Sequence, residues 1–180
     1  MWPFKRKENI SYIKFVESLY SLAIDITNNY DLFNKIINEG PFDNKDKLEK
    51  NEVLRRKWEV FYFIFTIILL SCEKHQDNYK NIIQDLITVF SSQIPNNNKE
   101  CQGDILNERY VLYKNSLINK EPGPTWYLAN CFLSMAWLNM SDLEGKWLPH
   151  TLIENVEITR IVGGTIDFVN KLFDKYEIIM

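Results

Sequence analysis

Glycine and proline are scarce in this sequence, with 6 of each among 180 residues. Both residues interrupt helices, so their scarcity favours long helical segments. Aromatic residues are abundant by contrast, at 14% of the chain, and the fractions of 46% hydrophobic and 25% charged residues are those of an ordinary globular protein. The composition excludes intrinsic disorder and favours helices around a bulky core.

Cysteine and histidine, which serve most metal sites and many nucleophilic sites, are also rare. The cysteines are Cys72, Cys101 and Cys131, each in or beside an apolar helical pattern, and the chain has 2 histidines. This usage favours reduced thiols over a disulfide framework, as in a cytoplasmic protein. The basic residues near Met1 are followed by no continuous apolar stretch, which argues against a secretory signal.

A strong excess of one charge is missing as well, because 21 basic and 24 acidic residues leave a net charge of -3. Domains that bind nucleic acid over a broad surface are normally basic, so we expect no nucleic-acid partner. The tract Lys5–Lys7, with Trp2 and Phe4, has the composition of a weak membrane contact. Stable anchoring needs more than one such signal, so we expect no membrane partner and a flexible N-terminus over residues 1–8.

The longest apolar run, Val60 to Cys72, is too short to cross a membrane. At 1.5 Å per residue it reaches about 20 Å, whereas the hydrocarbon core of a bilayer is about 30 Å thick. A helix that is apolar on every side is a buried helix. The run therefore predicts the central helix of a bundle, with nearly complete burial of Phe61, Ile64, Phe65, Ile68 and Leu69.

Apolar residues recur at helical spacing over most of the chain. We expect helices over 9–27, from Asp43 or Asn44 to Glu73, and over 77–94, 104–118, 125–139 and 151–176, with a continuation of the first helix capped by Asp31. The fold prediction is all-α, a single domain over residues 1–180 that forms a bundle of about six helices. No β-hairpin signal is present.

Two features of these helices leave alternatives open. The charged first half of the central helix, which includes Arg55 and Arg56, is expected to project from the bundle or to be solvated. Gly163–Gly164 either breaks the last helix or lets another helix approach it closely.

Candidate catalytic groups are present only in weak patterns. Cys72 and His75 share a helix face at a spacing that zinc or a nucleophilic pair would use, but further ligands with paired spacing are missing. Carboxylates available for acid–base chemistry are Glu108, Asp142, Glu144, Glu154 and Glu157, and no pattern places them in an apolar pocket. We therefore expect no catalytic residue, no metal and no cofactor, and no enzymatic activity.

Side chains typical of protein interfaces are more common. One polar–aromatic cluster consists of Glu108, Arg109, Tyr110 and Tyr113, and further amphipathic aromatics are Trp126, Tyr127 and Trp137. Core packing is the alternative for each of them. Trp147 differs, because it stands in a polar segment between Lys146 and Leu148, and it is the best candidate for an interface anchor.

In overall character the chain resembles bacterial toxin-immunity proteins, including those of contact-dependent growth-inhibition systems. The resemblance implies a small cytoplasmic inhibitor that binds a protein partner, a basic toxin domain such as a nuclease, and covers its active site. The partner-binding surface is expected on polar loops and helix ends, at Asp142, Glu144, Trp147, Glu154 and Glu157. The alternatives are a helical regulatory or adaptor module of bacterial or phage origin and, third, an enzyme.

Overall fold

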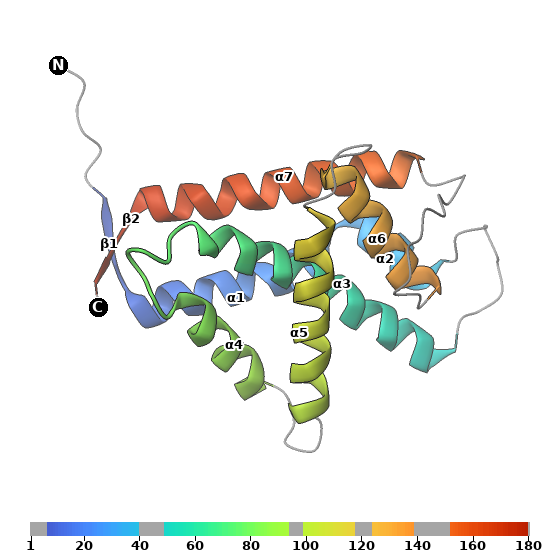
Figure 1. Ribbon diagram of the computed structural model, residues 1–180, viewed down its shortest axis with the longest axis horizontal. Coiled ribbons are helices and arrows are strands. Elements are labelled where there is room, and N and C mark those ends of the chain that lie inside the picture. The colour runs from blue at the N-terminus through green and yellow to red at the C-terminus, as the bar shows by residue number, and fades with distance from the viewer. Residues whose placement is uncertain (1–6, 40–48, 94–98, 118–123, 139–151, 180) are drawn as a thin grey trace.

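A computed structural model describes residues 7–39, 49–93, 99–117, 124–138 and 152–179 (Figure 1). Within these residues the elements are β1 (Glu8–Ser11), α1 (Tyr12–Asn29), α2 (Asp31–Asn38), α3 (Lys50–Glu73), α4 (Ile82–Gln93), α5 (Lys99–Ser116), α6 (Pro124–Leu138), α7 (Leu152–Lys175) and β2 (Tyr176–Ile179). The predicted all-α bundle is confirmed. The described part has seven helices where about six were expected.

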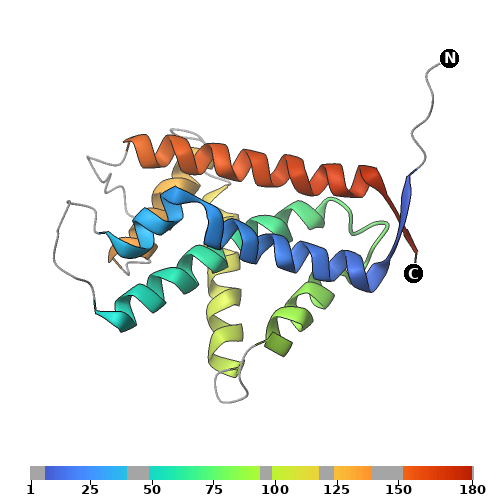
Figure 2. The ribbon, with the colours of Figure 1, turned by 180° about the vertical axis from the view of Figure 1, so that it is seen from behind.

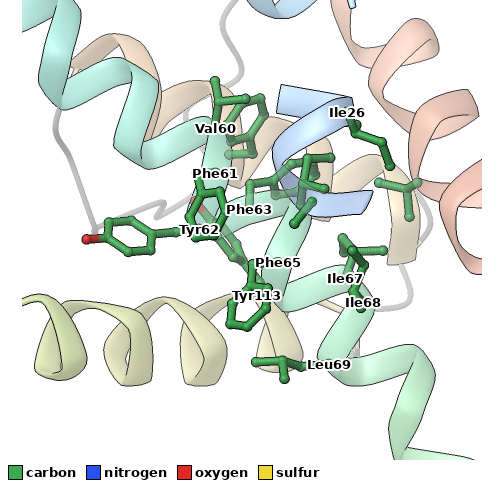
Figure 3. Close-up of a cluster of buried hydrophobic side chains, with 14 of the residues drawn as sticks. Ile26, Val60, Phe61, Tyr62, Phe63, Phe65, Ile67, Ile68, Leu69 and Tyr113 are labelled. Atoms are coloured by element: carbon green, nitrogen blue, oxygen red, sulfur yellow. The ribbon is translucent and has the colours of Figure 1, made fainter. Parts of the chain in front are cut away.

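Helix α3 is the centre of the bundle. It packs against each of the other six helices, and every residue from Val60 to Leu69 is buried. The side chains expected in the core, from Phe61 to Leu69, are indeed almost inaccessible, and Figure 3 shows them packed together with Tyr113 of α5. The central-helix prediction is therefore confirmed, and the short apolar run is explained by burial within protein. No helix in the described ranges combines the length and apolarity that a membrane crossing requires.

A single residue separates α1 from α2. Tyr30 has extended backbone angles, φ -90° and ψ 123°, and its carbonyl accepts the first backbone hydrogen bonds of α2. Asp31 is therefore the first residue of α2 and not its cap, which corrects the prediction. Its carboxylate still lies at the positive end of the helix dipole, where a negative charge is favourable.

Four predicted helix starts differ from the structure. The helix expected from residue 9 begins at Tyr12, after β1, and the helix expected from Asp43 or Asn44 begins at Lys50, because Glu49 is extended. The helix expected from residue 77 begins at Ile82, because residues 74–81 form a series of turns. Tyr79 in that segment packs against Phe173 of α7, with ring centroids 5.7 Å apart, so a tertiary contact replaces the expected helical turn. The helix expected from residue 104 begins earlier, at Lys99.

The two strands form a small parallel sheet that the sequence pattern did not predict. Glu8 pairs with Tyr176 and Ser11 with Ile179, so the sheet joins the start of α1 to the end of α7, as both views show (Figures 1 and 2). Lys7 adds a hydrogen bond from Nζ to the carbonyl oxygen of Phe173, at 3.2 Å. Glu8, expected at the end of a flexible N-terminus, is thus part of β1; residues 1–6 lie outside the described ranges.

Gly163 and Gly164 lie within α7, which continues through both without a break. Both are exposed, and a Cβ atom added to either would meet no heavy atom within 4 Å in the described structure. The glycines therefore do not end the helix, and no other described helix approaches them closely.

We expect Ile68→Ala to lower the free energy of unfolding by about 2–5 kcal/mol, since the change leaves a cavity in a fully packed core. Ile68 is 0% exposed, whereas Ile13 is 70% exposed and provides a matched control. Urea denaturation measures both variants. An Ile13→Ala variant that loses as much stability as Ile68→Ala would contradict the central position of α3.

We expect Gly164→Ala to raise the free energy of unfolding by about 0.5–1 kcal/mol, because alanine loses less conformational freedom in a helix. No described atom would clash with the added methyl group. Urea denaturation at low micromolar protein concentration is the measurement. A loss of stability there would mean that the helix is broken or covered at this point.

Candidate functional site

The predicted partner-binding residues are only partly within the described structure. Asp142, Glu144 and Trp147 lie outside it. Glu154 and Glu157 lie near the start of α7, but Glu154 forms an ion pair with Lys35 of α2, at 3.1 Å, and its side chain is mostly buried. Glu157 is exposed and has no hydrogen-bond or ion-pair partner among the described residues. Glu154 therefore joins two helices, while Glu157 remains available to a partner.

The thiols that are described lie in the core. Cys72 and Cys131 are buried, and burial raises the pKa of Cys72 to about 12 and that of Cys131 to about 11. A thiol at such a pKa is protonated at neutral pH and is a poor nucleophile. The side chain of Cys101 lies outside the described residues. The cysteines whose side chains are described therefore serve the packing of the core.

His75 is held by α7. Its ring stacks on Phe173 at a centroid distance of 3.8 Å, and its Nε2 lies 3.2 Å from Oδ1 of Asn170. His75 is therefore half-buried and held by α7, while Cys72 is buried. In the described part of the chain, no three His, Cys, Asp or Glu side chains are placed to share a metal ion.

A buried carboxylate joins α3 to α5. Glu59 accepts hydrogen bonds from Nε of Arg109, at 2.7 Å, and from the hydroxyl of Tyr113, at 2.6 Å. Burial and the adjacent carboxylate raise the pKa of Tyr113 well above its usual value. Farther along the interface, Glu73 accepts hydrogen bonds from Tyr110 and Lys114. The polar–aromatic cluster of α5 thus attaches this helix to α3.

Part of the charged first half of α3 is a structural junction, while Lys50, Asn51 and Lys57 are exposed as expected. Arg55 donates hydrogen bonds to the carbonyl oxygens of Met135 and Ala136, near the end of α6. Arg56 is buried and donates to the carbonyl oxygens of Ile36 and Glu39, at the end of α2. The last carbonyl groups of a helix have no partner within the helix, and cations are favourable beside them. This arrangement corrects the expectation of a solvated segment for Arg55 and Arg56.

Glu52 holds both guanidinium groups in place. Its two carboxylate oxygens accept hydrogen bonds from Arg55 at 2.8 Å, and Oε1 also accepts one from Arg56 at 2.8 Å. These bonds, those from Arg55 first, lower the pKa of Glu52 to about 2. One carboxylate therefore orients the two arginines that cap α2 and α6.

An open groove between α1 and α3 is a candidate binding surface. It has a volume of about 310 Å³ and is lined by Tyr20, Ile24, Thr27, Asn28, Leu54, Lys57, Trp58 and Phe61. Leu54 is 55% exposed and Ile24 is 38% exposed, so two large apolar side chains at the groove face solvent. The hydroxyl of Thr27 is already bonded to the carbonyl oxygen of Ala23.

The aromatic wall of this groove is fixed by its neighbours. Trp58 stacks on Tyr62, with ring centroids 5.7 Å apart and an interplanar angle of 24°, and meets Phe61 edge-on. Tyr20 contacts the rings of Phe61 and Phe65 in the same edge-on manner. A binding surface whose side chains are already ordered loses little conformational entropy when a partner binds.

The sequence interpretation did not identify this groove. Trp58 stands at the start of the apolar half of α3 and Leu54 within its charged half, and neither position indicates a binding surface by itself. The signal available in the sequence was the pair Leu54 and Trp58, which lie one helical turn apart and so share a face.

No family model, curated protein sequence or solved structure matches this chain.

We expect Glu52→Gln to lower the free energy of unfolding at pH 7 by about 1–2 kcal/mol, since hydrogen bonds to a charged group are lost and the site is partly screened by solvent. The pKa of Glu52 is lowered in the folded state, from 4.5 to about 2. Its contribution is therefore complete above pH 4.5 and is lost as the pH falls toward 2.

Urea denaturation over this pH range tests the assignment. The Glu52→Gln variant should lose less stability on acidification than the parent chain, while Glu17→Gln, at an exposed position of α1, should follow the parent chain. Identical acid profiles for the parent chain and Glu52→Gln would show that Glu52 does not hold the two arginines.

Proposed function

We propose that this chain is a protein-binding inhibitor and that it binds its partner through the groove between α1 and α3. The observation that supports the proposal is the exposure of Leu54 and Ile24 beside the ordered rings of Trp58 and Tyr20. Tryptophan and tyrosine dominate the energetic centres of protein interfaces. The single cation of the groove, Lys57, would then meet a carboxylate of the partner.

The shape of the groove supports a protein partner over a small molecule. Small-molecule sites enclose most of their ligand and place several polar groups around it. This groove is open and mainly apolar, with Asn28 and Lys57 as its exposed polar side chains. An apolar side chain of a partner helix or loop can enter it while the surrounding surfaces of the two proteins exclude water.

The specific form that we propose is an immunity protein that acts in the cytoplasm and neutralises a cognate bacterial toxin. What supports this form is the overall resemblance to toxin-immunity proteins and the acidic balance of the chain, with a net charge of -3. The groove would anchor the toxin, and the bulk of the helical bundle would cover its active site. The assignment of Asp142, Glu144, Trp147, Glu154 and Glu157 to the interface with a basic toxin remains a prediction.

We expect Leu54→Asp or Ile24→Asp to weaken partner binding by about 2 kcal/mol or more, roughly 30-fold in Kd, because a carboxylate replaces an apolar contact at the centre of the interface. Val111→Asp is the matched control, since Val111 is also an exposed apolar residue but lies on α5. Circular dichroism establishes that the variants remain folded.

The partner to use is the product of the gene immediately upstream, co-expressed with this chain. Growth arrest by that product alone, relieved by the parent chain and by Val111→Asp but not by Leu54→Asp, is the expected result. The immunity form fails if the product is harmless alone or remains toxic beside the parent chain. Binding through the groove to a harmless product would instead favour an adaptor.

A further inference from the structure

One face of α7 is not covered by any other described element. The helix forms an outer edge of the molecule in both views and packs against α3 and α6 through its opposite face (Figures 1 and 2). The uncovered face carries three large apolar side chains, Ile153, Val156 and Phe168, of which Ile153 is 70% exposed. Ile153 and Val156 lie near the start of α7, and Phe168 lies about 18 Å farther along the helix, so the face offers apolar contact at two separate points.

The charges on this face are arranged with opposite signs about its midpoint. Gly163–Gly164 marks the midpoint, with Arg160 three residues before the pair and Asp167 three residues after it. Glu157 and Lys171 flank the midpoint about one helical turn farther out. All of these residues are exposed and therefore lie on the same side of α7.

We propose that this face binds a second copy of the chain, with the two α7 helices antiparallel about a two-fold axis at Gly163–Gly164. In that arrangement Arg160 faces the partner's Asp167, and Glu157 lies beside the partner's Lys171. The symmetry repeats both pairs, so four ion pairs form. A parallel arrangement would instead place each charge opposite its own copy and is disfavoured by repulsion.

The centre of this face permits the close approach that the pairing needs. Neither Gly163 nor Gly164 carries a Cβ atom, so two helix backbones can approach there without steric conflict. Phe168 comes next to the partner's Arg160, where a guanidinium can lie over the aromatic ring. The ion pair between Lys171 and Asp167 within α7 is exposed and contributes little, so it does not hold these charges back from a partner.

The extent of α7 limits the strength of the association. Its 24 residues give a helix about 36 Å long, and a contact along one helix covers less than the roughly 800 Å² per partner of a standard interface. We therefore expect a dimer with a Kd in the micromolar range. Its exposed ion pairs also predict a weaker dimer at high salt.

Sedimentation equilibrium of the full chain up to about 200 µM tests the dimer, since this range covers micromolar dissociation constants. Arg160→Asp and Asp167→Arg, each alone, should raise the Kd by about tenfold or more, because each places like charges together twice across the axis. An equimolar mixture of the two variants should form a heterodimer with all of its facing charges opposite. Lys14→Asp, on the exposed surface of α1, is the control for a change in net charge.

The mixture separates association from folding, because a variant that failed to fold would not be rescued by its counterpart. Gly164→Ala provides a second readout: the same methyl group that stabilises the single chain should weaken the dimer severalfold. A parent chain that stays monomeric up to about 200 µM would overturn the proposal. So would a dimer that Arg160→Asp leaves intact, or single variants that remain monomeric when mixed.

Discussion

The burial of α3 on every side is the constraint on which the rest of this structure depends. A helix whose middle section is apolar all round cannot lie at a surface, so it must be covered by neighbours. The other six helices each contribute one apolar face to that cover. The surrounding helices bury their inner faces against α3, and their outer faces remain exposed to solvent. The groove beside Trp58 and the open face of α7 are two such surfaces.

This central position also determines where the charges of α3 can be placed. Glu59 and Arg56 are buried with the helix, and a buried charge without a partner is strongly destabilising. Glu59 is satisfied by Arg109 and Tyr113, which fixes α5 across α3. Arg56 is satisfied by carbonyl oxygens at the end of α2. The polar contacts therefore specify which helices meet, while the apolar contacts supply the larger part of the stability.

Helical periodicity was sufficient to predict the fold class and the central helix. The run from Val60 to Leu69 is apolar on nearly every face, which is typical of a buried helix and not of a surface helix. Periodicity could not predict the strands at Glu8–Ser11 and Tyr176–Ile179, which are four residues each and pair across almost the whole chain. Nor could it place Arg56, since a basic residue in a charged segment is usually solvated. Its burial depends on the helix end that happens to meet it, and that is a property of the tertiary structure.

The groove between α1 and α3 could not be predicted from the sequence for a related reason. The groove combines side chains of α1 and α3, and only their packing brings Ile24 beside Leu54. The groove lining shares no residue with the α7 face built around Gly163–Gly164, so binding in the groove would leave that face free. A dimer through α7 would carry two grooves related by a two-fold axis. A partner that presents two copies of its own site would then be held with an avidity that neither groove has alone. The weak contact between the α7 helices would thus act mainly by joining two grooves. Each groove would supply the affinity for one copy of the partner's site, and dimerisation through α7 would supply the second groove.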